Sequence, residues 1–241
     1  MNDKPRVLIL IPAFNEEAII GKTVTEIRNS IAKSDFASFD LVVIDDASSD
    51  RTANLAAEAG ARVVTLPMNL GIGGAVQAGY MYAEKGDYDI AVHMDGDGQH
   101  DPAEIKNLVF PVLQGECDYN IGCRFHDTCK YQASLFRRMG MIFASFITLM
   151  ATGVDIPDPT SGFSAVNRAC IQIFCREWHL HFAAVPSYIE AHRKGLKIKI
   201  MPAHFRKRST GYSSITLCEA VFSPFRIMIT ALGSVIRKSG V

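Results

Sequence analysis

The chain is organised around the stretch Val92-His93-Met94-Asp95-Gly96-Asp97-Gly98-Gln99-His100-Asp101-Pro102, where an apolar run ends at side chains that carry oxygen. Residues 90–92 have the composition of the end of a buried strand. If the backbone stays extended, Asp95, Asp97 and Gln99 project to one side, because strand side chains alternate with period two. Oxygen donors alone suit a hard divalent cation, so this stretch predicts a site for Mg²⁺ or Mn²⁺.

Two glycines alternate with these donors. Gly96 and Gly98 leave the opposite side of the stretch bare, so a bulky ligand can approach the backbone. Residues 101–104, Asp-Pro-Ala-Glu, predict a helix start, with Asp as the cap and Pro in the first position. The donors are therefore expected on a turn between a strand and a helix. The alternative is an acidic turn without a ligand, because Asp and Gly are common in turns.

Length and composition exclude several classes of protein. The 241 residues are 48% hydrophobic, which suits one α/β domain with a large core. Lys and Arg together number 25, as do Asp and Glu, so the chain has no net positive charge that would attract nucleic acid. The six cysteines form no Cys-x-x-Cys pair, which favours reduced thiols over zinc or a disulfide framework. We expect neither a signal peptide nor a membrane span, since no uncharged apolar run reaches roughly 18 residues.

Apolar runs that predict buried strands alternate with segments of helical period. Strands are expected at residues 6–11, 41–44, 62–66, 89–94, 119–124, 164–166 and 197–201. Helices are expected from residue 15 to about 31, after residue 50, from the segment 69–75 through residue 84, after residue 101, at 170–175 and at 187–194. This alternation predicts a doubly wound α/β fold with a mostly parallel central sheet flanked by helices. Ligands of such sheets bind at the carboxyl ends of the strands, where Asp46 and Asp95 both lie.

Two further segments allow two interpretations each. Residues 69–79 contain Gly-x-Gly-Gly after the third strand, so they do not match a dinucleotide fingerprint, which follows the first strand. The glycines there also fit close packing of a helix on a strand. Residues 206–211 form a basic loop, which is either a solvated run of charge or a site that holds phosphates.

The motifs, taken in order, resemble a known family. They are residues 11–16, 43–48, 69–79, 95–99, 122–124 and 158–163, and Arg208. The chain resembles the inverting family-2 glycosyltransferases of the GT-A fold, in particular the polyprenyl-phosphate sugar synthases related to dolichyl-phosphate mannose synthase. This resemblance covers residues 6–215 and implies a Rossmann-like nucleotide-binding half. It implies one GT-A domain at residues 1–216, with residues 217–241 as an amphipathic interface helix of the same domain.

The resemblance also implies roles for individual residues. The residues expected to bind the nucleotide sugar are Pro12, Phe14, Glu16, Ile44, Asp46, Asp95, Gly96, Asp97, Gln99 and Arg208. The metal ligands among them are Asp95, Asp97 and Gln99. The catalytic set is Asp97, Arg124 and Arg208, and the lipid phosphate is expected on Arg124 and Arg137. Residues 137–168 resemble bacterial members that make undecaprenyl-phosphate sugars, many of which work with a small membrane protein.

The expected reaction moves a hexose or N-acetylhexosamine from a UDP- or GDP-sugar to undecaprenyl or dolichyl phosphate, for cell-envelope glycan synthesis. A phosphate monoester is already anionic at neutral pH, so this nucleophile needs no general base. A divalent metal and Arg208 would stabilise the departing nucleoside diphosphate. Attack on the face opposite the leaving group inverts the sugar carbon.

Three alternatives remain open at the level of sequence. Transfer to a sugar hydroxyl of a growing polysaccharide would need a base, for which Glu190 and His181 are the candidates. A catalytically silent scaffold is the second alternative, against which Asp95, Asp97 and Arg208 argue. A nucleotidyltransferase would carry a basic Gly-rich loop after the first strand, where residues 13–16 read Ala-Phe-Asn-Glu. The sequence does not name the sugar, the base or the lipid length.

We expect the protein to bind the cytoplasmic face of the cell membrane without spanning it. Residues 139–154 and 221–236 are the most apolar stretches, and both are too short or too interrupted to span about 30 Å of hydrocarbon. The second stretch has an apolar helical face: Val221, Phe225, Met228, Ile229, Leu232 and Ile236. Its neighbouring cations are Arg226, Arg237 and Lys238. The alternative is that both helices pack on the sheet or form the seam of a homo-oligomer.

Overall fold

The computed structural model describes residues 4–124, 135–159, 161–176 and 184–206, with side chains from residue 142 on in the second range. The strands are β1 (Arg6–Ala13), β2 (Ser38–Asp45), β3 (Arg62–Thr65), β4 (Ile90–His93), β5 (Tyr119–Cys123), β6 (Ser164–Asn167) and β7 (Ile198–Pro202). The helices are α1 (Ile20–Ile31), α2 (Thr52–Glu58), α3 (Gly71–Lys85), α4 (Ile105–Leu113), α5 (Leu135–Thr152), α6 (Arg168–Arg176) and α7 (Ala184–Arg193). A short 3₁₀ helix, η1 (Pro102–Glu104), leads into α4.

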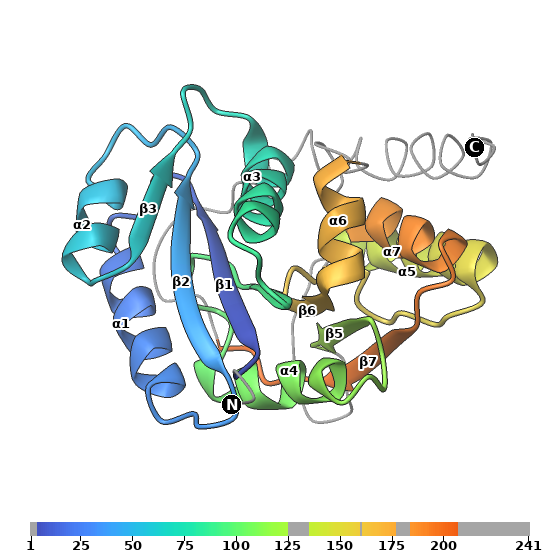
Figure 1. Ribbon diagram of the computed structural model, residues 1–241. Helices are drawn as coiled ribbons and strands as arrows, with labels where there is room; N and C mark the ends of the chain where they lie inside the picture. The colour runs from blue at the N-terminus through green and yellow to red at the C-terminus, as the bar shows by residue number, and fades with distance from the viewer. Residues whose placement is uncertain (1–3, 125–134, 160, 177–183, 207–241) are drawn as a thin grey trace.

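The strands form one sheet in the order β3-β2-β1-β4-β6-β5-β7 (Figure 1). β1 pairs in parallel with β2 and with β4, β2 pairs in parallel with β3, and β5 pairs in parallel with β7. β6 runs antiparallel to both of its neighbours, β4 and β5. The predicted mostly parallel central sheet is thus confirmed, and β6 is the antiparallel strand that the sequence pattern did not single out.

The two faces of β1 belong to two different halves of the core. Val7, Ile9 and Ile11 are fully buried in a cluster with residues of α1 and α4. Leu8 and Leu10 are equally buried in a second cluster with residues of α3 and α6. Helices therefore cover both faces of the sheet, as Figure 1 shows, which is why the strands read as continuous apolar runs.

The helix start after the central stretch follows the prediction. The side chain of Asp101 accepts a hydrogen bond from the backbone N–H of Ala103 at 3.1 Å, and Pro102 is the first helical residue. The cap anchors the chain directly after the oxygen-bearing turn, because it fixes the direction in which η1 and α4 leave the sheet.

The first helix begins later than predicted. α1 starts at Ile20, whereas the sequence suggested a start at Asn15. Asn15 has a φ of 53°, and its backbone N–H is donated to the side chain of Ser48 at 2.9 Å. Residues 15–19 therefore form a turn that is bonded to another loop, and a helix cannot include a residue with that backbone conformation.

The longest helix among the described residues, α5, packs on α7 through one side. Ala144 of α5 is fully buried with Val185 and Ile189 of α7. Its opposite side bears large exposed apolar side chains: Ile142, Phe143, Phe146, Leu149 and Met150. Among the described residues, no helix is both long and apolar enough to cross a membrane.

Candidate active site

The carboxyl ends of β1, β2 and β4 lie side by side, so the residues that follow these strands meet at one edge of the sheet. The register places Pro12 of β1 directly opposite Ile44 of β2. Both residues are buried, while Phe14 is 45% exposed just beyond the strand. The sheet therefore brings together three of the residues expected to hold a nucleotide, and it presents Phe14 as the exposed member.

Hydrogen bonds join the loop after β1 to the loop after β2. The backbone N–H of Asn15 donates to Ser48 Oγ at 2.9 Å, and the Asn15 side chain in turn accepts from the backbone N–H of Ser49 at 2.9 Å. The backbone N–H of Glu16 donates to Thr52 Oγ1 at 2.8 Å. Residues 43–48 were expected to form a motif of their own, and no sequence pattern indicated that this loop is bonded to the loop after β1. The link fixes the loop that carries Phe14 and Glu16.

Asp46 is buried and joins a third loop to the same edge. Its backbone N–H donates to the carbonyl of Ala13 at 2.9 Å, and its Oδ1 accepts the backbone N–H of Leu70 at 2.7 Å. Burial raises the pKa of Asp46, although the hydrogen bonds from the segment before α3 act in the opposite direction. Asp46 thus ties residues 69–71, which the sequence marked as a motif, to the ends of β1 and β2.

The oxygen-bearing stretch is a turn and not an extended strand. β4 ends at His93, residues 96–98 turn, and Gly98 has a φ of 73°. Asp97 Oδ1 accepts the backbone N–H of Gln99 at 3.0 Å, which is an Asx-type contact typical of turns. The expected period-two alternation of Asp95, Asp97 and Gln99 is therefore wrong, because this local hydrogen bond and the left-handed glycine replace the strand conformation.

Two histidines flank the carboxylate of Asp95. His93 Nε2 lies 3.3 Å from Oδ1, and His100 Nε2 lies 3.4 Å from Oδ2. Burial by itself raises the pKa of Asp95, but His100 and then His93 outweigh it and hold the pKa below its ordinary value. Burial lowers the pKa of His100 to about 4. At neutral pH, Asp95 is therefore ionised and His100 is neutral.

His100 is enclosed by aromatic rings. Its ring centroid lies 4.8 Å from that of Phe163 and 5.1 Å from that of Phe205. The backbone of Phe205 pairs with that of His100, and the N–H of Arg206 donates to the carbonyl of Gln99 at 2.7 Å. The segment after β7 is thus fixed against the turn, although more than a hundred residues separate them in the sequence.

Arg124 comes from the end of β5 and is held by a buried acid. Its Nε donates to Asp158 Oδ2 at 2.8 Å, and Asp158 is fully buried. The guanidinium carbon lies 5.0 Å from the centre of the Phe205 ring, which places Arg124 beside the rings around His100. The sequence predicted Arg124 as a cation of the site but missed His93, His100, Asp158 and Phe205. Of these four residues, only Asp158 lies in a segment that the sequence marked as a motif, residues 158–163.

Two glycines permit close approach behind the turn. A Cβ on Gly162 would lie 2.9 Å from His93 Cε1 and 3.0 Å from Asp95 Oδ1. A Cβ on Gly96 would lie 3.2 Å from the carbonyl oxygen of Pro12. Gly96 was expected to leave room for a ligand, and in the structure the space next to its Cα is taken by the end of β1. Its role there is close packing of two strand ends.

Some expected site residues lie outside the described part of the chain. These are Arg208, His181 and the C-terminal segment from residue 217. Arg137 lies in α5, in the part whose side chains are not described. Glu190, a candidate base, is buried on α7 with Arg193 Nη1 at 3.9 Å and Lys194 Nζ at 4.0 Å from its carboxylate oxygens. The Glu190 carboxylate is therefore paired with two cations that follow it closely in the chain.

The oxygen-bearing side chains of the turn are suited to a cation that is bound partly by the protein and partly by the substrate. Among the described residues, no three His, Cys, Asp or Glu side chains gather into a metal-binding group. Asp95 and Asp97 offer carboxylates and Gln99 offers an amide. Mg²⁺ is commonly held by one or two carboxylates together with substrate phosphates, and such an arrangement needs no complete cage of protein ligands. The residues present fit that kind of shared site.

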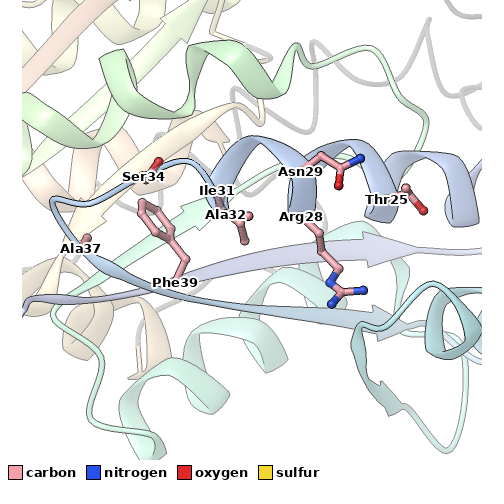
Figure 2. A pocket seen from close by; sticks show the side chains of 8 residues that line it. All are labelled: Thr25, Arg28, Asn29, Ile31, Ala32, Ser34, Ala37 and Phe39. Carbon is pink, nitrogen blue, oxygen red and sulfur yellow. The ribbon is translucent and has the colours of Figure 1, made fainter.

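A separate hollow lies away from this edge. It has a volume of about 480 Å³ and is open to solvent (Figure 2). Its lining residues are Thr25, Arg28, Asn29, Ile31, Ala32, Ser34, Ala37 and Phe39. They belong to the end of α1 and the start of β2. Because β2 runs from Ser38 toward Asp45, this hollow lies near the opposite edge of the sheet from Asp46.

Two of the similar proteins are named as sugar transferases that act on lipid phosphates. The chain is 28% identical over 220 residues to an undecaprenyl-phosphate mannosyltransferase of Micrococcus luteus, covering 88% of each chain. It is 26% identical over 190 residues to a UDP-N-acetylglucosamine–dolichyl-phosphate N-acetylglucosaminyltransferase of Methanococcus voltae, covering 71% of this chain and 73% of that one. It is also 32% identical over 203 residues to an uncharacterised protein of Methanocaldococcus jannaschii, covering 83% of this chain and 81% of that one.

Solved structures confirm the expected GT-A fold. Glucosyl-3-phosphoglycerate synthase from Mycobacterium tuberculosis, in complex with phosphoglyceric acid, superposes with a TM-score of 0.74 at 22% identity. The superposition covers 98% of this chain and 82% of that chain. A structure of the same enzyme with Mn²⁺, UDP and glucosyl-3-phosphoglycerate gives a TM-score of 0.73, also at 22% identity and with the same coverage. Residues 8–174 match the family Glycosyl transferase family 2. The chain therefore belongs to glycosyl transferase family 2 and is a glycosyltransferase.

Proposed function

We propose that this glycosyltransferase moves a hexose or N-acetylhexosamine from a nucleotide-diphosphate sugar to a polyprenyl phosphate, with inversion. One structural observation carries the proposal. The ends of β1, β2 and β4 place an exposed aromatic ring, Phe14, and an acidic turn, residues 95–99, at one edge of the sheet. The named relatives, whose substrates are undecaprenyl or dolichyl phosphate, support the choice of acceptor.

The donor is expected to lie across this edge. Phe14 offers an exposed face for the base, and Glu16 follows it on a loop that Thr52 holds in place. Asp95, Asp97 and Gln99 would hold a divalent cation, Mg²⁺ or Mn²⁺, together with the diphosphate of the donor. The bound cation supplies positive charge that stabilises the leaving diphosphate. The test therefore includes both UDP- and GDP-sugars as donors.

The acceptor phosphate is expected to bind to arginine side chains. Arg124 is fixed by Asp158 and directed beside Phe205, so its guanidinium is already oriented when a phosphate arrives. Arg137 and Arg208 complete the proposed set of cations. The attacking oxygen of a phosphate monoester is already anionic, so the chain needs to position it and does not need to remove a proton.

The same acceptor implies contact with a membrane surface. α5 presents Ile142, Phe146 and Met150 on its exposed side, at 62%, 58% and 72% exposure. Because a polyprenyl chain stays in the bilayer, the site must come to its phosphate, and an exposed apolar helix face suits the interfacial region. We place the protein on the cytoplasmic face of the cell membrane, with residues 217–241 as a second interface helix of the same domain. A small membrane protein that supplies true spans and a homo-oligomer are the expected partners.

The decisive experiment is an assay for release of nucleoside diphosphate. The full chain is incubated with a panel of UDP- and GDP-sugars, with Mg²⁺ or Mn²⁺, and with undecaprenyl phosphate in mixed micelles. Parallel reactions replace the lipid phosphate with a polysaccharide acceptor that offers only hydroxyl groups. Release that depends on the lipid phosphate supports the proposal. Release only with the hydroxyl acceptor would assign the chain to polysaccharide extension, and no release with any donor would favour the scaffold.

A further inference from the structure

His100 contacts Asp95 through both of its ring nitrogens. The backbone N–H of Asp95 donates to His100 Nδ1 at 3.0 Å. A nitrogen that accepts a hydrogen bond carries no proton, so the neutral ring must carry its proton on Nε2. Nε2 lies 3.4 Å from Asp95 Oδ2, on the side-chain end of the same residue. One imidazole therefore contacts the backbone and the carboxylate of Asp95 at once.

The position of the His100 ring is fixed from outside the turn. Phe163 and Phe205 enclose it, and the ring is 2% exposed. Phe205 is also paired with the His100 backbone. Because the His100 ring is packed too tightly to move, it restricts the orientations that the Asp95 carboxylate can adopt.

The second oxygen of Asp95 is confined as well. His93 Nε2 lies 3.3 Å from Oδ1 and is buried, and it makes no well-aligned hydrogen bond within the part of the chain that the structure describes. Gly162 lies close behind both groups, because a Cβ there would approach Asp95 Oδ1 to 3.0 Å. The carboxylate therefore has a ring nitrogen near each oxygen and backbone behind it.

We propose that His100 is a positioning residue: as the Nε2–H tautomer it fixes the orientation in which Asp95 meets the cation of the nucleotide sugar. This inference rests on the proposed function, because it assumes that Asp95 faces a donor-bound cation. It adds a role that the acidic turn alone does not provide. Partners that orient metal-binding carboxylates typically change metal affinity 10- to 100-fold when they are removed.

Two substitutions test the roles of His100 Nδ1 and Nε2 separately. In His100→Asn, the amide oxygen can take the place of Nδ1 and accept the Asp95 N–H, but nothing reaches the carboxylate. In His100→Gln, the longer amide can bring an N–H to the place of Nε2. We expect His100→Asn to weaken Mn²⁺ binding in the presence of UDP by about tenfold, and His100→Gln to stay within about threefold of the unchanged protein. Electron paramagnetic resonance of free Mn²⁺ measures both affinities without turnover.

A core variant controls for lost stability. Val109→Ala removes buried volume from α4, outside the turn that carries Asp95, and is expected to lower the melting temperature without changing Mn²⁺ affinity. If His100→Asn and His100→Gln bind Mn²⁺ like the unchanged protein, or lose affinity equally, the positioning role is overturned. If the unchanged protein binds no Mn²⁺ with UDP present, the proposed metal-dependent function fails instead, and the next measurement still judges His100.

That measurement is the tautomer itself. Long-range ¹H–¹⁵N correlation spectra of the full chain distinguish a protonated Nε2 from a protonated Nδ1, and the His100 signal is assigned by its loss in His100→Gln. The expected result is a neutral ring with its proton on Nε2 in the unchanged protein, without any metal. A proton on Nδ1 would overturn the inference, whatever the enzymatic assays show.

Discussion

Arg124 donates its Nε–H to Oδ2 of Asp158 at 2.8 Å, and Asp158 has no exposed surface. The pair joins the end of β5 to the segment before β6, two parts of the chain that are 34 positions apart. A carboxylate buried this deeply must keep its cation, because an unpaired charge in the interior is costly. The pair therefore fixes the plane of the guanidinium and the loop that carries Gly162 at the same time.

Removing the acid of this pair is expected to destabilise the fold. Asp158→Ala removes the buried carboxylate that accepts the Nε–H of Arg124, a side chain that is 13% exposed, so the free energy of unfolding should fall by roughly 3 kcal/mol. Urea unfolding followed by circular dichroism measures the change. Glu116→Ala is the matched control, since its pair with Lys199 is exposed to solvent and should contribute little to stability. Equal costs for the two variants would show that the Arg124–Asp158 pair adds nothing through its burial.

Replacement of Asp97 is expected to separate activity from stability. An Asn at this position keeps the oxygen that accepts the Gln99 N–H, so Asp97→Asn should change the free energy of unfolding by less than about 0.5 kcal/mol. The negative charge is lost, and turnover should fall at least about 100-fold, as it should in excess chelator. Asp87→Asn, at an exposed acid next to Arg168, serves as the control and should leave turnover unchanged. Full activity in Asp97→Asn would contradict the metal assignment.

Lysine is not expected to replace the arginines that we assign to phosphate binding without a loss of activity. Arg124→Lys and Arg137→Lys keep the charge but lose the planar fork that binds phosphate through two hydrogen bonds. Arg124→Lys also loses the Nε contact with Asp158, so it should lower both kcat and stability. Arg137→Lys should raise KM for the lipid phosphate, with donor binding less affected. Initial rates at varied donor and acceptor concentrations test both, and unchanged kinetics in both variants would rule out the assignment.

The exposed face of α5 is expected to bind lipid. Replacing Ile142, Phe146 and Met150 together by Ser should reduce co-flotation with anionic liposomes, because it removes large apolar side chains that are 62%, 58% and 72% exposed. The control is Met81→Ser on α3, where the side chain is 56% exposed but stands on another element. A chain that ends before Val221 measures how much of the liposome binding depends on the C-terminal segment.

Membrane docking would be refuted by a simple result. If the full chain, the α5 variant and the shortened chain all remain unbound to liposomes, and no membrane protein is recovered with the full chain, then the apolar face of α5 serves another purpose. A concentration-dependent molecular mass that the serine substitutions abolish would identify that purpose as an oligomer seam.

The thiols of the core are expected to react slowly. Burial raises the pKa of Cys117 to about 11 and that of Cys123 to about 12. At pH 8 these thiols are therefore protonated, and alkylation by iodoacetamide should be at least tenfold slower in the native protein than in urea. Because the folded pKa values are raised, the unfolded chain loses these protons first. The free energy of unfolding should consequently fall as the pH rises above 9, the ordinary thiol value, toward 12.

Mass spectrometry of alkylated peptides follows each thiol separately. Cys129 and Cys218 lie outside the described residues, and a variant with Ser at both positions removes their contribution. Rapid labelling of Cys117 and Cys123 in the folded protein at pH 8 would contradict their burial.

The order of strands along the chain was predictable because burial on both faces of a sheet demands continuous apolar runs. The runs that become β1 and β2 carry that signal without interruption, and both were placed to within a few residues. The start of α1 was misplaced because Asn15 takes a left-handed conformation and bonds to Ser48, which lies 33 positions away. No local pattern contains a partner that distant.

The sequence by itself determined the alternation of strands and helices, the cap at Asp101, and the clustering of acids at the ends of β2 and β4, since each follows from residues next to one another. The tertiary structure alone decided how those acids are used. It turned the chain at Gly98, set His100 against both ends of Asp95, and held Arg124 on Asp158 beside Phe205. The contacts of Arg124 with Asp158 and Phe205 join residues that only the folded sheet brings together. The energies of all these contacts depend on burial, and a side chain becomes buried only when the chain folds.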